Sequence, residues 1–453
     1  KMLYAPLSTE YNCVTYTPLY WYLCAIPCNI FGMSFFWPRL VSLLAAIGCM
    51  IILFLWAWRL TGKHLFLSVA APVLFIATNY FLTFWLIEVT THAVFCLFTI
   101  LGFYLLINPS RRNTVFSALA LSAAVMTKHT AMAYLVAAAI LLVFRDFRRF
   151  LLFTFVSIVA VGLSCLYLEI FEGNFFLQTV TANSGLPWAW KRLISEVFQD
   201  FFFGSFGVML LFAFIQILID DQSDNRGFMR RIWKPEFLMT AAGIGVGIIA
   251  SPKLGSGPTH CLIGAAGIIL CGIAGLNNTV KFIKNPYSTR ILIGVVMAQL
   301  AILLLLAIPL FPSFLIDYHD REKMKNISNV FKAGRTCFFG IPYIQRQFGQ
   351  PSAGIPDDEP TKWKKGQLTY AFIPPELSLP FKNQDFDFVI VGSYFDPNHP
   401  VAKAIMENYK TMLGRFPAHP KYPRMGDMRF DCYVMQANRL NSSSNTNVMS
   451  HKR

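Results

Sequence analysis

Long apolar runs follow one another through the first two thirds of the chain, separated by short polar or basic breaks. A helix needs roughly 20 mainly apolar residues to cross the hydrocarbon core of a bilayer, and several runs approach or reach that length. The pattern predicts apolar helices at residues 16–36, 39–58, 64–81, 84–107, 150–170, 201–219, 236–250, 261–276 and 290–312. We expect roughly eight to eleven membrane crossings. The shorter runs leave open whether the number of crossings is odd or even.

Residues 113–144 form an apolar stretch with a polar interruption, Thr127-Lys128-His129-Thr130, at its centre. A continuous helix of this length would extend about 48 Å, which is too long for one crossing and too short for two. Basic clusters flank the stretch on both sides, as is typical of cytoplasmic loops. The pattern therefore predicts a hairpin of short helices, with Lys128 and His129 at or near the outer surface. Residues 171–199 are predicted to be a loop that holds an amphipathic stretch at the interface.

Charged residues become more frequent after residue 312. This change predicts a mainly α protein with a polytopic membrane domain at 1–312 and a small soluble α/β domain at 313–436, followed by a disordered tail at 437–453. Within the second domain, the pattern predicts a buried strand at 387–393, a helix at 399–415 and a closing strand at 429–436.

The composition excludes some functions. The chain is 55% hydrophobic and 14% charged, with a net charge of +15. Its basic residues in the apolar part stand in short clusters between the runs, where they orient membrane proteins, so membrane lipids rather than nucleic acid are the expected partners. The 10 cysteines include no CxxC pair, and no metal-ligand spacing is present.

Ionisable groups in an apolar setting are energetically expensive and are functional candidates by default. Seven such residues stand out: Arg39, Glu88, His92, Lys128, His129, Lys253 and His260. Structural roles compete with functional ones. The side chain of Arg39 could extend along the lipid so that its charged end reaches the interface. Glu88 and His92 are four residues apart and could pair with each other on one helix face. The Thr-Lys-His-Thr break could also be an ordinary helix-hairpin turn.

A second polar break, the stretch 251–260, places Lys253 and His260 on either side of a Gly-Ser-Gly-Pro turn. Irregular backbone at membrane depth is tolerated only beside protein or a water-filled cavity. Two breaks that each contain a lysine suggest one cavity lined by cations, suited to an anionic ligand such as a lipid phosphate. Two unrelated surface turns are the alternative.

Four short motifs, in this order along the chain, carry a family resemblance. They are Tyr16-Thr17-Pro18-Leu19-Tyr20, Gly32 followed by Arg39-Leu40-Val41-Ser42, Met126-Thr127-Lys128-His129-Thr130-Ala131, and Lys253-Leu254-Gly255-Ser256 with His260. Their order and spacing, with a C-terminal domain after the last span, resemble the GT-C fold membrane glycosyltransferases of the protein O-mannosyltransferase and aminoarabinose-transferase type.

The resemblance implies transfer of a sugar from a polyprenyl-phosphate carrier to a lipid, glycan or protein acceptor at the outer face of the membrane. It also implies a bacterial inner membrane location, with the active site and the C-terminal domain facing outward. Lys128 is the first candidate for contact with the carrier phosphate, and Lys253 and His260 are the second. Tyr16 and Tyr20 are further site candidates. No cofactor is firmly expected, although a divalent metal is compatible with this chemistry.

The sequence departs from the family pattern in two places. The resemblance places the catalytic acidic base upstream of Lys1, so we expect an N-terminally truncated chain whose catalytic residue is unknown and whose activity as a fragment is open. An Arg-x-Asp element expected near residue 88 is replaced by Glu88-Val89-Thr90-Thr91-His92. A transporter or lipid flippase, and a catalytically silent scaffold of the same fold, are the alternatives. Two pseudo-symmetric halves would favour transport, and a recess open to lipid at one face would favour the enzyme.

Overall fold

The computed structural model describes most of the apolar part of the chain and selected segments of the rest. The described residues are 16–32, 34, 36–81, 86, 90–108, 110–181, 190, 193–223, 233–252, 258–283, 287–307, 336–339, 354–355, 362–364, 367–369, 378–392, 400–417 and 431–438. The chain divides into two compact units. The helical unit holds Tyr16–Leu168 and Pro187–Ile308, and the second unit holds Lys1–Thr15, Glu169–Leu186 and Pro309–Arg453.

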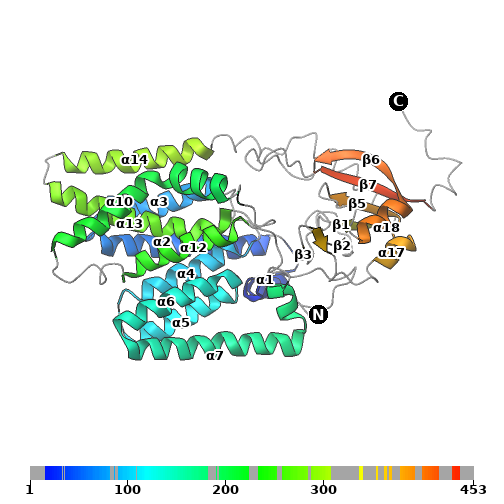
Figure 1. Cartoon of the computed structure of the whole chain (residues 1–453), viewed down its shortest axis with the longest axis horizontal. Coiled ribbons are helices and arrows are strands. Elements are labelled where there is room, and N and C mark those ends of the chain that lie inside the picture. The colour runs from blue at the N-terminus through cyan, green and yellow to red at the C-terminus, as the bar shows by residue number, and fades with distance from the viewer. Residues whose placement is uncertain are drawn as a thin grey trace. The chain divides into compact units, whose positions relative to one another are not determined.

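Helices dominate the described part of the apolar region, and Figure 1 shows most of them lying roughly parallel in one bundle, with the short helix α1 crossing their direction. The α-helices are α1 (Leu19–Phe31), α2 (Phe36–Leu60), α3 (Leu65–Phe81), α4 (His92–Leu105), α5 (Arg111–Val125), α6 (Met132–Arg145), α7 (Phe147–Glu172), α10 (Phe206–Ser223), α12 (Pro235–Ala250), α13 (Leu262–Ile283) and α14 (Ser288–Ala307). Segments of other helix types are η1 (His129–Ala131), η2 (Leu177–Thr181), η3 (Leu193–Ser205) and η4 (Pro258–Cys261).

The predicted helical hairpin around Lys128 is confirmed. Helix α5 ends at Val125, α6 begins at Met132, and the residues between them form the turn. The interpretation of 171–199 as a loop is wrong in three places. Helix α7 continues to Glu172, π-helix η2 covers Leu177–Thr181, and π-helix η3 begins at Leu193 and leads into α10. Leu193, Val197 and Phe201 recur every four residues and are buried, so the apolar side of this amphipathic stretch packs against protein.

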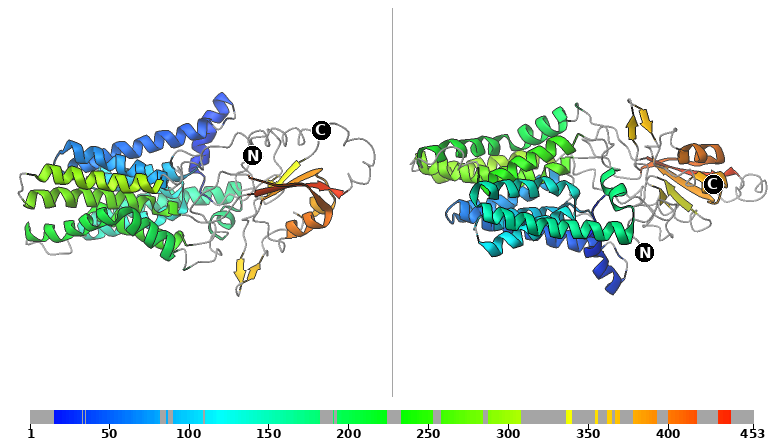
Figure 2. Two further views of the ribbon diagram at one scale, coloured as in Figure 1. Left: turned by 90° about the horizontal axis from the view of Figure 1, so that it is seen from above. Right: turned by 60° about the horizontal axis from the view of Figure 1, so that its bottom comes forward.

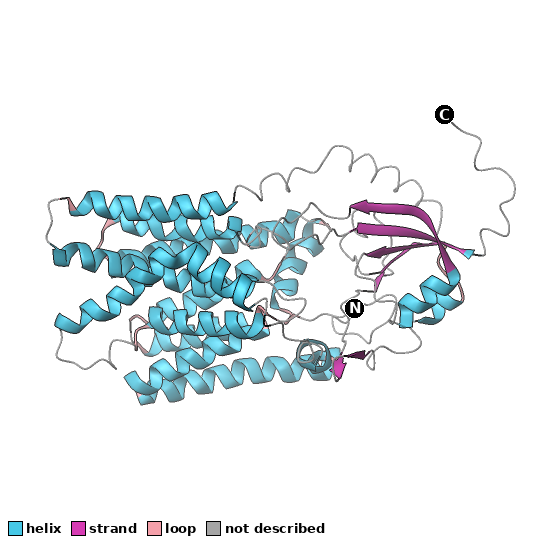
Figure 3. Ribbon diagram, turned by 45° about the horizontal axis from the view of Figure 1, so that its top comes forward, coloured by secondary structure: helices cyan, strands magenta, loops and turns pink. Residues whose placement is uncertain are grey.

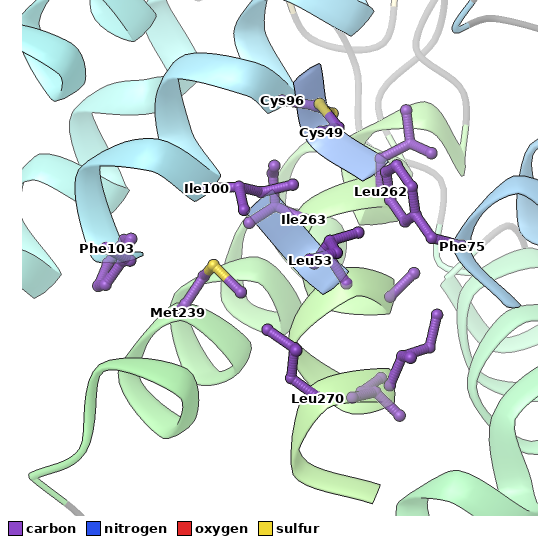
Figure 4. Packing of buried hydrophobic residues seen from close by; sticks show 14 of the residues in the cluster. Cys49, Leu53, Phe75, Cys96, Ile100, Phe103, Met239, Leu262, Ile263 and Leu270 are labelled. Carbon is purple, nitrogen blue, oxygen red and sulfur yellow. The ribbon is translucent and has the colours of Figure 1, made fainter. Parts of the chain in front are cut away.

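Helix α13 is the centre of the helical unit. It packs against α10, α12, α3 and α2, and 94% of its apolar window is buried. Figure 4 shows Leu262, Ile263 and Leu270 of this helix among side chains from the surrounding helices, and both views of Figure 2 show the helices of this bundle running alongside one another. A helix that is apolar on all sides and enclosed by other helices is typical of the core of a membrane bundle.

Three described helices are long and apolar enough to cross a bilayer: Phe36–Leu60, Phe147–Glu172 and Thr259–Lys281. Shorter apolar helices of 10–17 residues accompany them. Helix α7 exposes large apolar side chains such as Phe155, Ile158 and Leu163 along its length, which suits a surface in contact with lipid chains. The chain is therefore a mainly α, polytopic membrane protein.

The second unit contains a five-stranded mixed sheet in the order β2-β1-β5-β7-β6, with its strands in magenta in Figure 3. Its strands are β1 (Thr336–Phe339), β2 (Gly354–Ile355), β5 (Phe388–Gly392), β6 (Tyr409–Pro417) and β7 (Asp431–Ala437). Strands β1, β2 and β5 pair in parallel, whereas β7 is antiparallel to both of its neighbours. A separate hairpin, β3 (Lys362–Lys364) with β4 (Gln367–Thr369), and helices α17 (Leu379–Lys382) and α18 (Pro400–Asn408) complete the described elements.

The two strands expected at 387–393 and 429–436 are confirmed as β5 and β7. The expectation of one helix over 399–415 is wrong in its second half, because α18 ends at Asn408 and β6 begins at Tyr409. Pairing with β7 overrides the local pattern there. The domain boundary expected at 312 and most of the expected tail lie outside the described residues.

Candidate functional site

Lys128 lies in the turn between α5 and α6, with an extended backbone that separates the two helices. Its amide donates to the carbonyl of Ala124 at 2.9 Å, and its own carbonyl accepts from Ala131 at 2.9 Å. These two bonds fix the turn at both ends. The side chain is only 1% exposed, so the ammonium group points into the helical unit and away from solvent.

Three side chains surround the ammonium of Lys128. Its Nζ lies 3.4 Å from Nδ1 of His92. The ring centroids of Tyr16 and Phe95 lie 5.9 and 5.8 Å from Nζ, within the range of cation–π attraction. We call these four residues the Lys128 site. Helix α4 begins at His92, and the spacing of three residues to Phe95 places both side chains on the same side of its first turn.

Two thiols and a phenol extend the surroundings of the site. Cys96 and Cys261 lie within electrostatic range of the Lys128 ammonium. Tyr134 of α6 is fully buried, and its ring centroid lies 5.8 Å from that of Phe95. Cys261 ends η4, directly after His260. The residue that directly follows the second polar break therefore lies in the neighbourhood of Lys128.

The segment before α1 is tied to the end of α5 by two hydrogen bonds. The hydroxyl of Thr17 donates to the carbonyl of Val125 at 2.8 Å, and the amide of Leu19 donates to the carbonyl of Met126 at 2.8 Å. Tyr20, one helical turn further on, shares a hydrogen bond of 3.1 Å with the hydroxyl of Ser42. Three of the four sequence motifs thus meet, and the first of them carries Tyr16 to the Lys128 site.

We expect Thr17→Val to lower the stability of the protein by about 1 kcal/mol, because valine keeps the shape of the side chain but cannot donate to the buried carbonyl of Val125. The measurement is the apparent melting temperature of the purified protein in detergent. Thr17→Ser keeps the hydroxyl and serves as the control. Equal melting temperatures for the valine and serine variants would contradict the role assigned to this bond.

The other candidates from the sequence lie as follows. Arg39 is exposed on the first turn of α2. His129 and His260 are half-buried in η1 and η4, and Tyr20 is buried against Ser42. None of these four has a contact with Nζ of Lys128 among the contacts of the described residues. Glu88 and Lys253 lie outside the described residues.

The electrostatics of the Lys128 site favour an anion. A buried ammonium is costly unless opposite charge or hydrogen bonds compensate it. Lys128 has no oppositely charged partner among the described residues, because no carboxylate there lies within 4.0 Å of it. The ion pair found in that part of the chain joins Arg149 to Asp146. Helix α4 also begins here, so the positive end of its dipole adds to the charge of the lysine. The arrangement can accept a phosphate or carboxylate group.

An apolar groove runs past the same turn. It encloses about 460 Å³ between the start of α1, the end of α5 and α7. Its lining includes Leu19, Met126 and Leu163, and Met126 precedes Lys128 by two residues. The described residues include no cluster of three His, Cys, Asp or Glu side chains placed to hold a metal ion.

Some residues around Lys128 were not among the sequence candidates: Thr17, Phe95, Cys96, Tyr134 and Cys261. The spacing of three and four residues from His92 was a usable signal for Phe95 and Cys96, because it places all three on one helix face. The sequence held no comparable signal for Tyr134 or Cys261, which approach the site only through the packing of α6 and η4.

Solved structures with the same fold exist. ArnT from Cupriavidus metallidurans, an aminoarabinose transferase, matches in its apo state with a TM-score of 0.54 at 13% identity, over 93% of this chain and 88% of that one. The ArnT structure bound to undecaprenyl phosphate matches with a TM-score of 0.51 at 13% identity, over 93% of this chain and 87% of that one. This chain has the GT-C fold.

The match covers nearly the whole chain, so the fold implied by the four motifs is confirmed. No protein-family model matches the sequence, and no curated protein matches it. At 13% identity the likeness shows the fold, and the role of each site residue depends on its own surroundings.

Proposed function

We propose that the protein is a membrane glycosyltransferase that takes a sugar from a polyprenyl-phosphate carrier, and that Lys128 binds the phosphate of that carrier. The observation that carries the proposal is the buried ammonium of Lys128, which has no carboxylate partner among the described residues. The GT-C fold supports it, since one structure with this fold holds undecaprenyl phosphate.

A cation is the group that this reaction needs. The acceptor hydroxyl oxygen attacks the anomeric carbon of the sugar, and the bond from that carbon to the phosphate oxygen breaks. The electron pair of the broken bond stays on the phosphate, which gains one negative charge, while the hydroxyl proton passes to a base that the described residues do not identify. Lys128 stabilises the charge that develops on the phosphate, where a preorganised donor in a dry site is most effective.

The groove beside the site is suited to the carrier's hydrocarbon chain. Polyprenyl chains are apolar, and the groove is lined mainly by apolar side chains of α1, α5 and α7. Its lining includes Met126, two residues before Lys128 in the chain, so the proposal places the phosphate end of the carrier at this end of the groove. Helix α7 faces outward along much of its length, which leaves a path for the chain to extend into the bilayer.

The finer features of the proposal follow the family resemblance. The reaction takes place at the outer face of a bacterial inner membrane, with Lys253 and His260 as further phosphate contacts. The acceptor is a lipid, a glycan or a protein. Tyr16 belongs to the Lys128 site, whereas Glu88, Arg39, Tyr20 and His129 stay candidates for contacts with the sugar or the acceptor.

The test is a transfer assay with the full chain in proteoliposomes. Labelled polyprenyl-phosphate sugars of several kinds are supplied with candidate acceptors, and free undecaprenyl phosphate is added as a competitor. The proposal predicts transfer of label from at least one donor and inhibition by undecaprenyl phosphate. A protein that binds undecaprenyl phosphate and moves it across the bilayer, without breaking the sugar–phosphate bond of any donor, would instead be a transporter.

A further inference from the structure

We propose that His92 is a positioning residue that orients the ammonium of Lys128 toward the carrier phosphate by accepting a hydrogen bond without neutralising the charge. The inference rests on the proposed function, because it assigns a task to a neighbour of the phosphate-binding lysine. It concerns the end of the stretch Glu88-Val89-Thr90-Thr91-His92, which stands where an Arg-x-Asp element was expected.

The contact between the two side chains defines which group donates. An ammonium carries three N–H donors and no acceptor. The 3.4 Å contact from Nζ therefore requires that Nδ1 of His92 accept, which places the ring proton on Nε2. His92 is 4% exposed and Lys128 1% exposed, so the bond lies in a dry environment where its direction is held by packing.

The other contacts of the ammonium offer no second hydrogen-bond acceptor among the described residues. The rings of Tyr16 and Phe95 approach Nζ at 5.9 and 5.8 Å and offer π faces rather than hydrogen-bond acceptors. Among the described residues, His92 provides the hydrogen-bond acceptor that reaches Nζ. Two N–H donors of Lys128 are then without an acceptor among the described residues. In the proposal these two donors serve the phosphate oxygens of a bound carrier, and the bond to His92 determines where they point.

A neutral acceptor suits this task better than a carboxylate. An aspartate or glutamate at the same distance would pair with Lys128 and cancel its charge, so that a phosphate would have to compete for the ammonium. An apolar residue would leave the long lysine side chain free to choose other rotamers. Histidine provides direction and leaves the full positive charge for the ligand.

Substitutions at His92 separate these possibilities. His92→Asn places an oxygen near the position of Nδ1, His92→Leu removes the acceptor, and His92→Asp introduces a negative charge. For each purified full-length variant, the affinity for undecaprenyl phosphate and the melting temperature without ligand are measured. His64→Leu, in the turn between α2 and α3, is the control for the loss of a histidine elsewhere.

The inference predicts that the asparagine variant binds undecaprenyl phosphate within about threefold of the wild type and that the leucine variant binds at least about tenfold more weakly. The aspartate variant should melt at the same temperature as the wild type or higher, because it pairs with Lys128, and still bind at least about tenfold more weakly. A purely structural role for His92 predicts instead that affinity follows the melting temperature.

Wild-type affinity in the leucine and aspartate variants would overturn the role of His92 and leave the proposed function standing. Failure of the wild-type protein to bind undecaprenyl phosphate would overturn the proposed function itself. The double variant Lys128→Met/His92→Leu should bind no more weakly than Lys128→Met alone, because the two residues act through one contact. Additive losses would contradict the positioning role.

Discussion

Lys128→Met should lower the rate of sugar transfer by about 100-fold or more, because it removes the buried cation that stabilises the charge developing on the carrier phosphate. Methionine keeps much of the length and apolar volume of the lysine stem. The affinity for undecaprenyl phosphate should fall by about 10- to 100-fold, as expected for loss of a charge-assisted contact. Both quantities are measured on the same preparation, in proteoliposomes and in detergent respectively.

Lys281→Met is the matched control, because Lys281 is an exposed lysine at the end of α13. It removes the same charge from the protein and should change neither quantity by more than about twofold. Lys128→Met should also leave the melting temperature unchanged or raised, since it takes an uncompensated charge out of the interior. Full transfer activity in Lys128→Met would remove this lysine from the site.

Gly243→Ala should destabilise the helical unit by about 1–3 kcal/mol, through a clash of backbone with the new methyl group. Helices α12 and α13 approach closely at this glycine. A Cβ added at Gly243 would lie 2.5 Å from the Cα of Gly264 and 3.0 Å from the carbonyl carbon of Ile263. Neither atom can move without shifting the buried helix α13. The melting temperature in detergent and the yield of folded protein should both fall.

Gly245→Ala, two residues further along the same helix, tests whether the effect comes from contact. A Cβ added at Gly245 would meet no atom within 4 Å. Alanine has the higher helix propensity by about 1 kcal/mol, so this variant should be neutral or slightly more stable than the wild type. If both alanine variants lowered the melting temperature equally, the loss at Gly243 could not be assigned to the close approach of α12 and α13.

The length of the apolar runs predicted most of the helical unit, because a long apolar segment has few alternatives to a helix in a bilayer. The hairpin around Lys128 followed from the length of 113–144, its central polar interruption and the basic clusters on both sides. Local pattern was insufficient where partners distant in sequence decide the structure. Residues 409–415 became strand through pairing with β7, and η3 became helical because its apolar side packs against the bundle.

The candidate site was only partly visible in the sequence. Lys128, His92 and Tyr16 were identified as ionisable or motif residues, and the structure brings these three together. Their mutual contact could not be predicted, because they come from three segments that meet through tertiary packing. Arg39 had the same polar signal as Lys128, yet it is exposed. Residue type identified Arg39 and Lys128 alike as candidates. Burial and the distances to neighbouring side chains distinguished Lys128 from Arg39.

The central claim is that Lys128 binds the carrier phosphate, and the most direct test is an experimental structure of the protein in lipid nanodiscs with undecaprenyl phosphate bound. The account predicts a phosphate oxygen about 2.7–2.9 Å from Nζ of Lys128, the distance of a charge-assisted hydrogen bond, with His92 still accepting from the same ammonium. A phosphate bound elsewhere, with Lys128 enclosed by protein and out of reach of the ligand, would contradict it.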